Sequence, residues 1–267
     1  MKKELNGLQL SGKLSGWRVY KIKGVEKTIV ARKGGPTADQ IKNSPGYEKV
    51  RKFQQEFGAA SVLSKMVRKS LPESLFNKCE SYVSGKLTAR FRLLADGEDA
   101  NTGKRPLSLS KKGYLLQGFE FNSKNPFNHA FNTKFLAKTG SIRGQLILHT
   151  HSYVPQECIF PPANADYYKI FAHMIMLSDY VYSESQQEYL PLHPDFHGQY
   201  TTLESDLCPI INISRDPTTS RLSLYEGEEV PVETGLLLIK AILFYKKEGN
   251  KIIELEEGNA LKITNVL

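Results

Sequence analysis

The chain has 267 residues, of which 40% are hydrophobic and 24% are charged, and it carries a net charge of +8. A chain of this length buries a substantial core, and this composition is ordinary for a globular protein, which excludes extensive disorder. No stretch approaches 18 consecutive apolar residues, so we expect no transmembrane helix and no membrane insertion. Lys2 and Lys3 are not followed by the apolar segment of a signal peptide. The sequence therefore predicts a cytoplasmic protein, with leaderless export or incorporation into a virion or other assembly left open.

The positive charge is concentrated near the N-terminus. Residues 1–70 hold 16 Lys and Arg but only 5 Asp and Glu, a net charge of +11, so the remaining residues carry −3. Such asymmetry is typical of proteins that meet nucleic acid or an acidic protein surface, which includes another copy of the same chain.

Residues 8–33 alternate in the manner of β-strands. Two sets of side chains are expected on opposite faces of the first strand: Trp17, Val19 and Lys21 on one, and Arg18, Tyr20 and Ile22 on the other. A turn at 23–26 leads to a second strand at 28–33. A two-stranded hairpin is marginally stable alone, so we expect it to dock on something.

A helix is predicted to follow this hairpin, which ends at Gly34-Gly35-Pro36. Ser44 is a favourable N-cap, and Pro45 suits the first helical position. Apolar residues then recur every three or four positions to about Leu71: Tyr47, Val50, Phe53, Phe57, Ala60 and Leu63. Pro72 ends this helix, and a second one is predicted over 73–94, which gives an αα-hairpin. The polar stretch 96–106 is typical of a linker or long loop.

From Gly113 onward the pattern is that of strands separated by turns. The segment 171–181 fits either a strand or a helix, and 248–250 is the turn of a clear hairpin. Strands are predicted at 113–122, 141–154, 165–183, 208–214, 220–225, 234–247 and 259–266.

The predicted fold class is α+β, with a β-hairpin and αα-hairpin arm ahead of an antiparallel Ig-like β-sandwich. We expect three regions: a basic hairpin arm at 1–35, a helical region and linker at 36–106, and the sandwich at 107–267.

A set of short motifs runs through the chain: G-K-L-S-G at 12–16, V-x-R-K-G-G-P-T-x-x-Q-I at 30–41, then S-P-x-Y, E-F-G-x-A, G-F-E-F-N, I-x-F-Y-x-x-x-G-N-K and N-A-L-K-I. By these motifs the chain resembles a family of leaderless Bacteroidota proteins that often occur as several divergent copies per genome. The resemblance covers both ends and most of the chain. It implies a basic N-terminal arm with helices followed by an Ig-like β domain, and it brings no activity, cofactor or catalytic residue. The chain departs from the family pattern in a polar insertion around 123–133.

Histidines provide the candidate for a metal site. His149 and His151 share a face of a predicted strand, and further ligands are available at 193–197 if that loop folds over the strand. The favoured interpretation is that these polar side chains lie on the solvent face of the sandwich.

Motifs of catalysis are missing from the sequence. It contains no G-x-S-x-G elbow, and the turn at 34–37 lacks a nucleotide-binding pattern, with Pro36 removing a backbone donor. We therefore predict a non-enzymatic protein without a cofactor.

Two functions remain for the basic N-terminal region. The first is that of a structural protein, a subunit of a homo-oligomeric, filamentous or phage-like assembly in which the arm packs on a neighbouring copy. The alternative is nucleic-acid binding, with cations on phosphates and exposed aromatic rings on bases. Both use the same ten residues: Trp17, Arg18, Tyr20, Lys21, Arg32, Lys33, Arg51, Lys52, Phe53 and Phe57.

Overall fold

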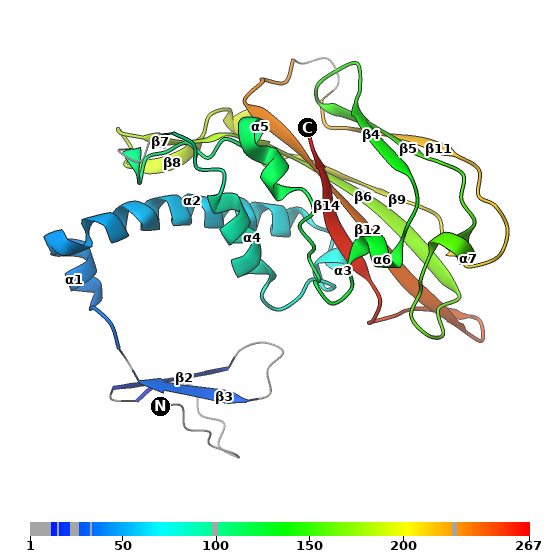
Figure 1. The fold of residues 1–267 in the computed structure, drawn as a ribbon, viewed down its shortest axis with the longest axis horizontal. Coiled ribbons are helices and arrows are strands. Elements are labelled where there is room, and N and C mark those ends of the chain that lie inside the picture. Colours follow the sequence, from blue (N-terminus) through cyan, green and yellow to red (C-terminus); the bar gives the residue numbers. More distant parts are fainter. Residues whose placement is uncertain (1–11, 15, 22–26, 33, 98–100, 226–228) are drawn as a thin grey trace. The chain divides into compact units, whose positions relative to one another are not determined.

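The fold is described from a computed structural model (Figure 1). The structure describes residues 12–14, 16–21, 27–32, 34–97, 101–225 and 229–267. The chain forms two compact units, residues 1–52 and residues 53–267, and the boundary between them lies inside helix α2 (Glu48–Ser70).

The first unit contains a small antiparallel sheet of order β1-β2-β3. Its strands are β1 (Gly12–Leu14), β2 (Trp17–Lys21) and β3 (Thr28–Arg32). The predicted hairpin is confirmed as β2 and β3, in a register that places Trp17 opposite Arg32 and Tyr20 opposite Ile29. The sequence did not reveal β1, which pairs with β2 as a third strand.

A short helix that was not predicted, α1 (Ala38–Asn43), follows this sheet. Thr37 caps it: its hydroxyl accepts from the Gln40 N–H at 3.1 Å, and the Gln40 side chain accepts from the Thr37 N–H at 2.8 Å. Ser44 and Pro45 then open only a 3-10 turn, η1 (Pro45–Tyr47), before α2 begins at Glu48.

The predicted αα-hairpin is present, but its second helix is broken into α3 (Glu73–Phe76) and α4 (Val83–Arg92). The break has a physical reason. Lys78 turns inward to an ion pair with Glu254 at 2.7 Å, and the Glu80 N–H donates to the Phe121 carbonyl. Both contacts require the chain to leave the helical path between the two segments.

The large sheet is built around two long central strands, β6 (Tyr167–Ser178) and β12 (Thr234–Glu248), which pair antiparallel along most of their length. β12 also pairs with β13 (Lys251–Glu254) and β14 (Ala260–Val266). β6 also pairs with β9 (Tyr200–Glu204) and β10 (Cys208–Pro209).

A second sheet has the order β11-β5-β4, and two further strands form a separate hairpin. The bounds are β4 (Phe135–Thr139), β5 (Gln145–Thr150), β11 (Thr218–Ser223), β7 (Tyr180–Ser183) and β8 (Glu188–Pro191). Short helical turns connect these strands: α5 (Leu109–Lys112), η3 (Gly113–Leu116), α6 (Phe127–Ala130), α7 (Pro155–Cys158) and η4 (Pro194–Phe196).

Most predicted strands are confirmed, including 171–181, which lies in β6 and the start of β7 rather than in a helix. The strand predicted at 113–122 is wrong over its first half, where η3 lies. The second half runs beside β14, with the Phe121 N–H donating to the Leu261 carbonyl. The strand predicted at 208–214 shrinks to Cys208–Pro209.

Residues 53–267 form three layers, with the large sheet in the middle (Figure 1). One face of this sheet packs against α2 and α4, where Leu63, Val67, Leu87 and Phe91 are buried with Ile239 in one core. The opposite face packs against the β11-β5-β4 sheet, so the architecture is α+β with a β-sandwich. The helices share a core with the sheet, and packing is therefore continuous across the boundary expected at residue 106.

The three cysteines are free and half-buried. Burial raises the pKa of the Cys79 thiol to about 12, which removes its thiolate form at neutral pH. Among the helices that the structure describes, none combines the length and apolar character that a membrane span requires.

Candidate interaction site

The β2–β3 hairpin exposes most of the side chains predicted to make contacts. Trp17 retains 39% and Tyr20 retains 44% of its accessible surface, whereas Val19 between them is buried. Pairing puts Trp17 beside Arg32 on one face and Arg18 beside Ala31 on the other. Each face of the hairpin therefore carries one aromatic ring and a cation: Trp17 with Arg32 on one face, and Tyr20 with Arg18 on the other. Lys33 lies outside the described residues.

Two of the predicted cations are engaged within the first unit. The Arg51 guanidinium donates to the carbonyls of Ile41, at 2.8 Å, and Ser44, at 2.9 Å, and so ties the end of α1 to α2. Lys52 pairs with Glu48 one turn earlier at 2.9 Å, and this bond lowers the pKa of the Glu48 carboxyl. Arg51 is thus a structural residue.

The apolar stripe of α2 is only half covered. Ala60, Leu63 and Val67 are buried in the core beneath the helix. Phe53 and Phe57, earlier on the same helix, remain 41% and 49% exposed. Arg92 of α4 lies over the Phe53 ring, with its guanidinium carbon 5.3 Å from the ring centroid, a cation–π contact that the sequence analysis missed.

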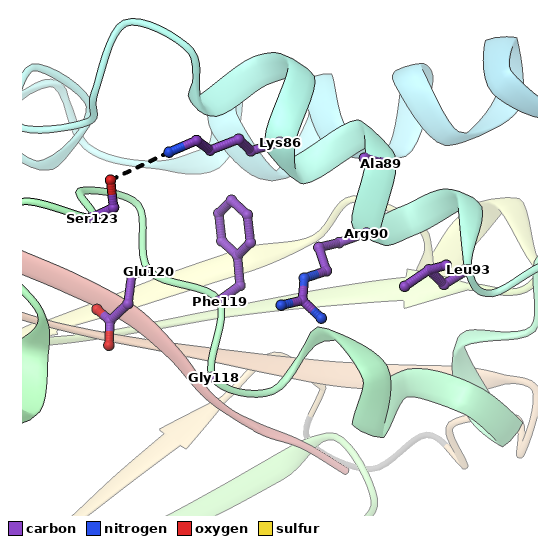
Figure 2. A pocket seen from close by; sticks show the side chains of 8 residues that line it. All are labelled: Lys86, Ala89, Arg90, Leu93, Gly118, Phe119, Glu120 and Ser123. Carbon is purple, nitrogen blue, oxygen red and sulfur yellow. Dashed lines mark hydrogen bonds between the residues drawn. The ribbon is translucent and has the colours of Figure 1, made fainter.

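A groove of about 600 Å³ lies between α4 and the segment 118–123 (Figure 2). In Figure 2 the Phe119 ring points toward α4 between Lys86 and Arg90. Lys86 donates to Glu80 and Ser123, while Glu120 accepts from the Phe127 N–H at 3.0 Å. The Arg90 guanidinium has no ion pair or hydrogen bond within the described part of the chain. The groove is lined by both positive and negative side chains, and most of these are paired with each other or with neighbouring groups. The groove therefore favours neither an anionic nor a cationic ligand.

The histidine pairs do not converge on a metal site. His149 contacts the Thr219 hydroxyl at 3.0 Å, with the His151 ring 5.0 Å away, while His193 pairs with Glu233 at 3.1 Å. His197 instead accepts the Ser178 N–H. Within the described ranges, no group of three or more His, Cys, Asp or Glu side chains is arranged to hold an ion.

A buried Ser–His pair joins α2 to the large sheet. The Ser70 hydroxyl lies 2.8 Å from His173 Nε2 and 2.8 Å from the Val67 carbonyl, and His173 Nδ1 lies 2.8 Å from the Thr202 hydroxyl. All three contacts are hydrogen bonds when the Ser70 hydroxyl donates to the Val67 carbonyl and accepts from Nε2 of His173. The imidazole then already carries a proton on the nitrogen that faces Ser70, so it does not act as a base toward that hydroxyl.

Charge is distributed unevenly between the two ends of the chain. Residues 1–52 contain 13 Lys and Arg and 4 Asp and Glu, a net charge of +9. Residues 179–267 contain 7 basic and 15 acidic residues, a net charge of −8. Residues 53–178 between them contain 16 basic and 9 acidic residues, a net charge of +7, so the acidic charge is concentrated in the last third of the sequence.

The chain matches no protein-family model, no curated protein and no solved structure. The resemblance to leaderless Bacteroidota proteins therefore stays a prediction.

Proposed function

We propose that the protein is a structural subunit that associates with further copies of itself through its basic N-terminal region and the exposed start of α2. The observation that carries this proposal is the uncovered half of the α2 stripe, where Phe53 and Phe57 keep 41% and 49% of their surface. Large aromatic side chains left open on an otherwise packed helix are typical of protein contacts.

The size of this patch sets an upper limit on what it contributes to association. A phenylalanine buries roughly 200 Å² when fully covered. The two rings together therefore leave about 180 Å² open, and covering this area contributes at most ~4.5 kcal/mol at ~25 cal/mol per Å². That alone is a modest contribution, so the association also needs contacts from the charged and aromatic residues of the arm.

Charge favours a second copy as the partner. The +9 of residues 1–52 complements the −8 of residues 179–267, so a head-to-tail arrangement brings opposite charges together. Such a heterologous contact forms a ring when the rotation closes and a filament when it does not.

Sedimentation of the full-length protein over a range of concentrations tests this function. We expect species larger than the monomer, which the double variant Phe53→Glu/Phe57→Glu reduces to monomer. Phe160→Glu is the matched control, because Phe160 is 58% exposed but lies outside the proposed surface. A monomer at every concentration for the unmodified chain would refute the proposal.

Nucleic-acid binding is the second candidate, and the hairpin favours it. Trp17 and Tyr20 are exposed beside Arg18, Lys21 and Arg32. In a mobility-shift titration, binding by these cations should fall by orders of magnitude from low to moderate salt. Association through buried apolar area should survive the same change, and no retardation at low salt removes this candidate.

A further inference from the structure

A second groove, of about 300 Å³, lies between the C-terminal half of α2 and strand β9. Four of its lining residues belong to the helix: Val62, Lys65, Met66 and Lys69. Tyr200 lines it from β9, and Gly198 lines it from the loop just before β9. All of these residues belong to the unit of residues 53–267.

The helix is held beside this strand by buried contacts. The chain of hydrogen bonds from Ser70 through His173 to Thr202 fixes the end of α2 against β6 and β9. One turn earlier, a side chain at Gly198 would place its Cβ only 2.9 Å from Met66 Sδ, so glycine permits the close approach. The groove is therefore built on fixed elements.

β9 is an edge strand whose outer side is open. At one end of the β6–β9 pairing the Ser205 N–H donates to the Ile170 carbonyl, and at the other end the Met176 N–H donates to the Gln199 carbonyl. In an antiparallel pair, every second residue of a strand directs its backbone N–H and carbonyl to the partner strand, and the residues between direct theirs away. Thr201 and Leu203 consequently direct their backbone groups to β6. Those of Tyr200, Thr202 and Glu204 point away, and no backbone partner meets them in the described part of the chain.

The groove carries unpaired positive charge beside apolar surface. Lys65 and Lys69 are exposed one helical turn apart, and neither forms an ion pair with any acidic residue that the structure describes. Val62 and Tyr200 retain 46% and 54% of their surface. A ligand that complements this groove is an extended peptide that carries both carboxylate and apolar side chains.

We propose that this groove binds an extended, acidic peptide segment of a partner protein, which adds as a further antiparallel strand to β9. The open backbone groups of Tyr200, Thr202 and Glu204 supply main-chain hydrogen bonds, and Lys65 and Lys69 select carboxylate side chains. This site is separate from Phe53 and Phe57, so it stands or fails independently of self-association.

Peptide selection on the full-length protein tests this site. A displayed library of seven-residue peptides should yield sequences that alternate acidic and apolar residues. A selected peptide, labelled with fluorescein, should then bind at least about tenfold more weakly to Lys65→Glu/Lys69→Glu, because two attractions become repulsions. Lys134→Glu/Lys138→Glu makes the same charge change at exposed positions on and beside β4 and should alter affinity less than about twofold.

Strand addition has a second signature. N-methylation of alternate amides in the selected peptide should abolish binding when those amides face β9 and leave it unchanged when they face outward. The proposal is overturned if no peptide is enriched, if the Lys65/Lys69 variant binds like the wild type, or if N-methylation shows no alternation.

Discussion

The Ser70 hydroxyl at the end of α2 lies 2.8 Å from Nε2 of His173 in the middle of β6. His173 is fully buried, and its other ring nitrogen lies 2.8 Å from the Thr202 hydroxyl of β9. A single neutral imidazole thus connects the helical layer to two adjacent strands of the large sheet.

This connection predicts a loss of stability in mild acid. Burial lowers the pKa of His173 to about 4, whereas an unfolded histidine titrates near 6.5. Because the unfolded chain binds the proton more tightly, stability is complete above about pH 6.5 and falls as the pH drops toward 4. The loss from this group approaches about 3 kcal/mol.

Denaturant titrations at several pH values check this dependence. His173→Gln should be less stable near neutral pH, yet lose less stability between pH 6.5 and 4 than the wild type. His129→Gln, at an exposed histidine, should keep the wild-type slope. An unchanged slope in the His173 variant would contradict this account of the network.

The ion pair between Glu56 and Arg105 predicts an asymmetric pair of variants. Both carboxylate oxygens accept from the guanidinium at 2.8 Å, the Gly103 N–H adds a third bond, and the Glu56 side chain is fully buried. These bonds outweigh the cost of burial and lower the pKa of the carboxyl. Arg105→Ala leaves a buried charge unpaired and should cost about 3–5 kcal/mol.

The double variant Glu56→Ala/Arg105→Ala should be destabilised less than Arg105→Ala, because no unpaired carboxylate remains. Lys104→Ala is the neighbouring control: its pair with Glu184 is exposed and should contribute less than about 1 kcal/mol. Additive losses in the double-mutant cycle would show that the pair does not act as a unit.

Lys240 on β12 predicts a substitution that stabilises the protein. Its side chain is buried against the Phe135 ring, and burial lowers the pKa of its amine to about 6. Lysine in the unfolded chain titrates near 10.4, so folding must release a proton at neutral pH. Lys240→Met removes this cost and should raise the free energy of unfolding by roughly 1–4 kcal/mol.

Thermal unfolding across a range of pH values checks that prediction. The wild type should gain stability as the pH rises from about 6 toward 10, and the Lys240 variant should show a flatter profile. Lys247→Met, at an exposed position of the same strand, should neither raise the stability nor flatten its pH profile. A Lys240 variant less stable than the wild type would reverse this interpretation.

The sequence predicted those parts of the fold that local pattern determines. The alternation of 17–21, the turn at 248–250 and the apolar stripe of α2 each correspond to an observed element. The break at 77–82 was not predictable, because it depends on contacts of Lys78 and Glu80 with distant residues. The capping box at Thr37 and Gln40 was readable from local spacing and was missed.

In the candidate surfaces, too, some features follow from local sequence and others depend on contacts between distant residues. Four of the aromatic residues predicted to make contacts are exposed in the structure, namely Trp17, Tyr20, Phe53 and Phe57. Arg51 looked like a surface cation but binds two carbonyls, a partnership that depends on how α1 folds back. The open edge of β9 depends on strand order, which alternation along one segment does not specify.

Self-association through the start of α2 requires that another copy of the chain covers Phe53 and Phe57. Hydroxyl-radical footprinting at increasing protein concentration tests it directly, because it reports side-chain exposure in the intact protein. We predict that Phe53 and Phe57 lose reactivity as the concentration rises, while exposed Phe160 keeps it. Equal reactivity of Phe53 and Phe57 in dilute and concentrated protein would show that no second copy covers them.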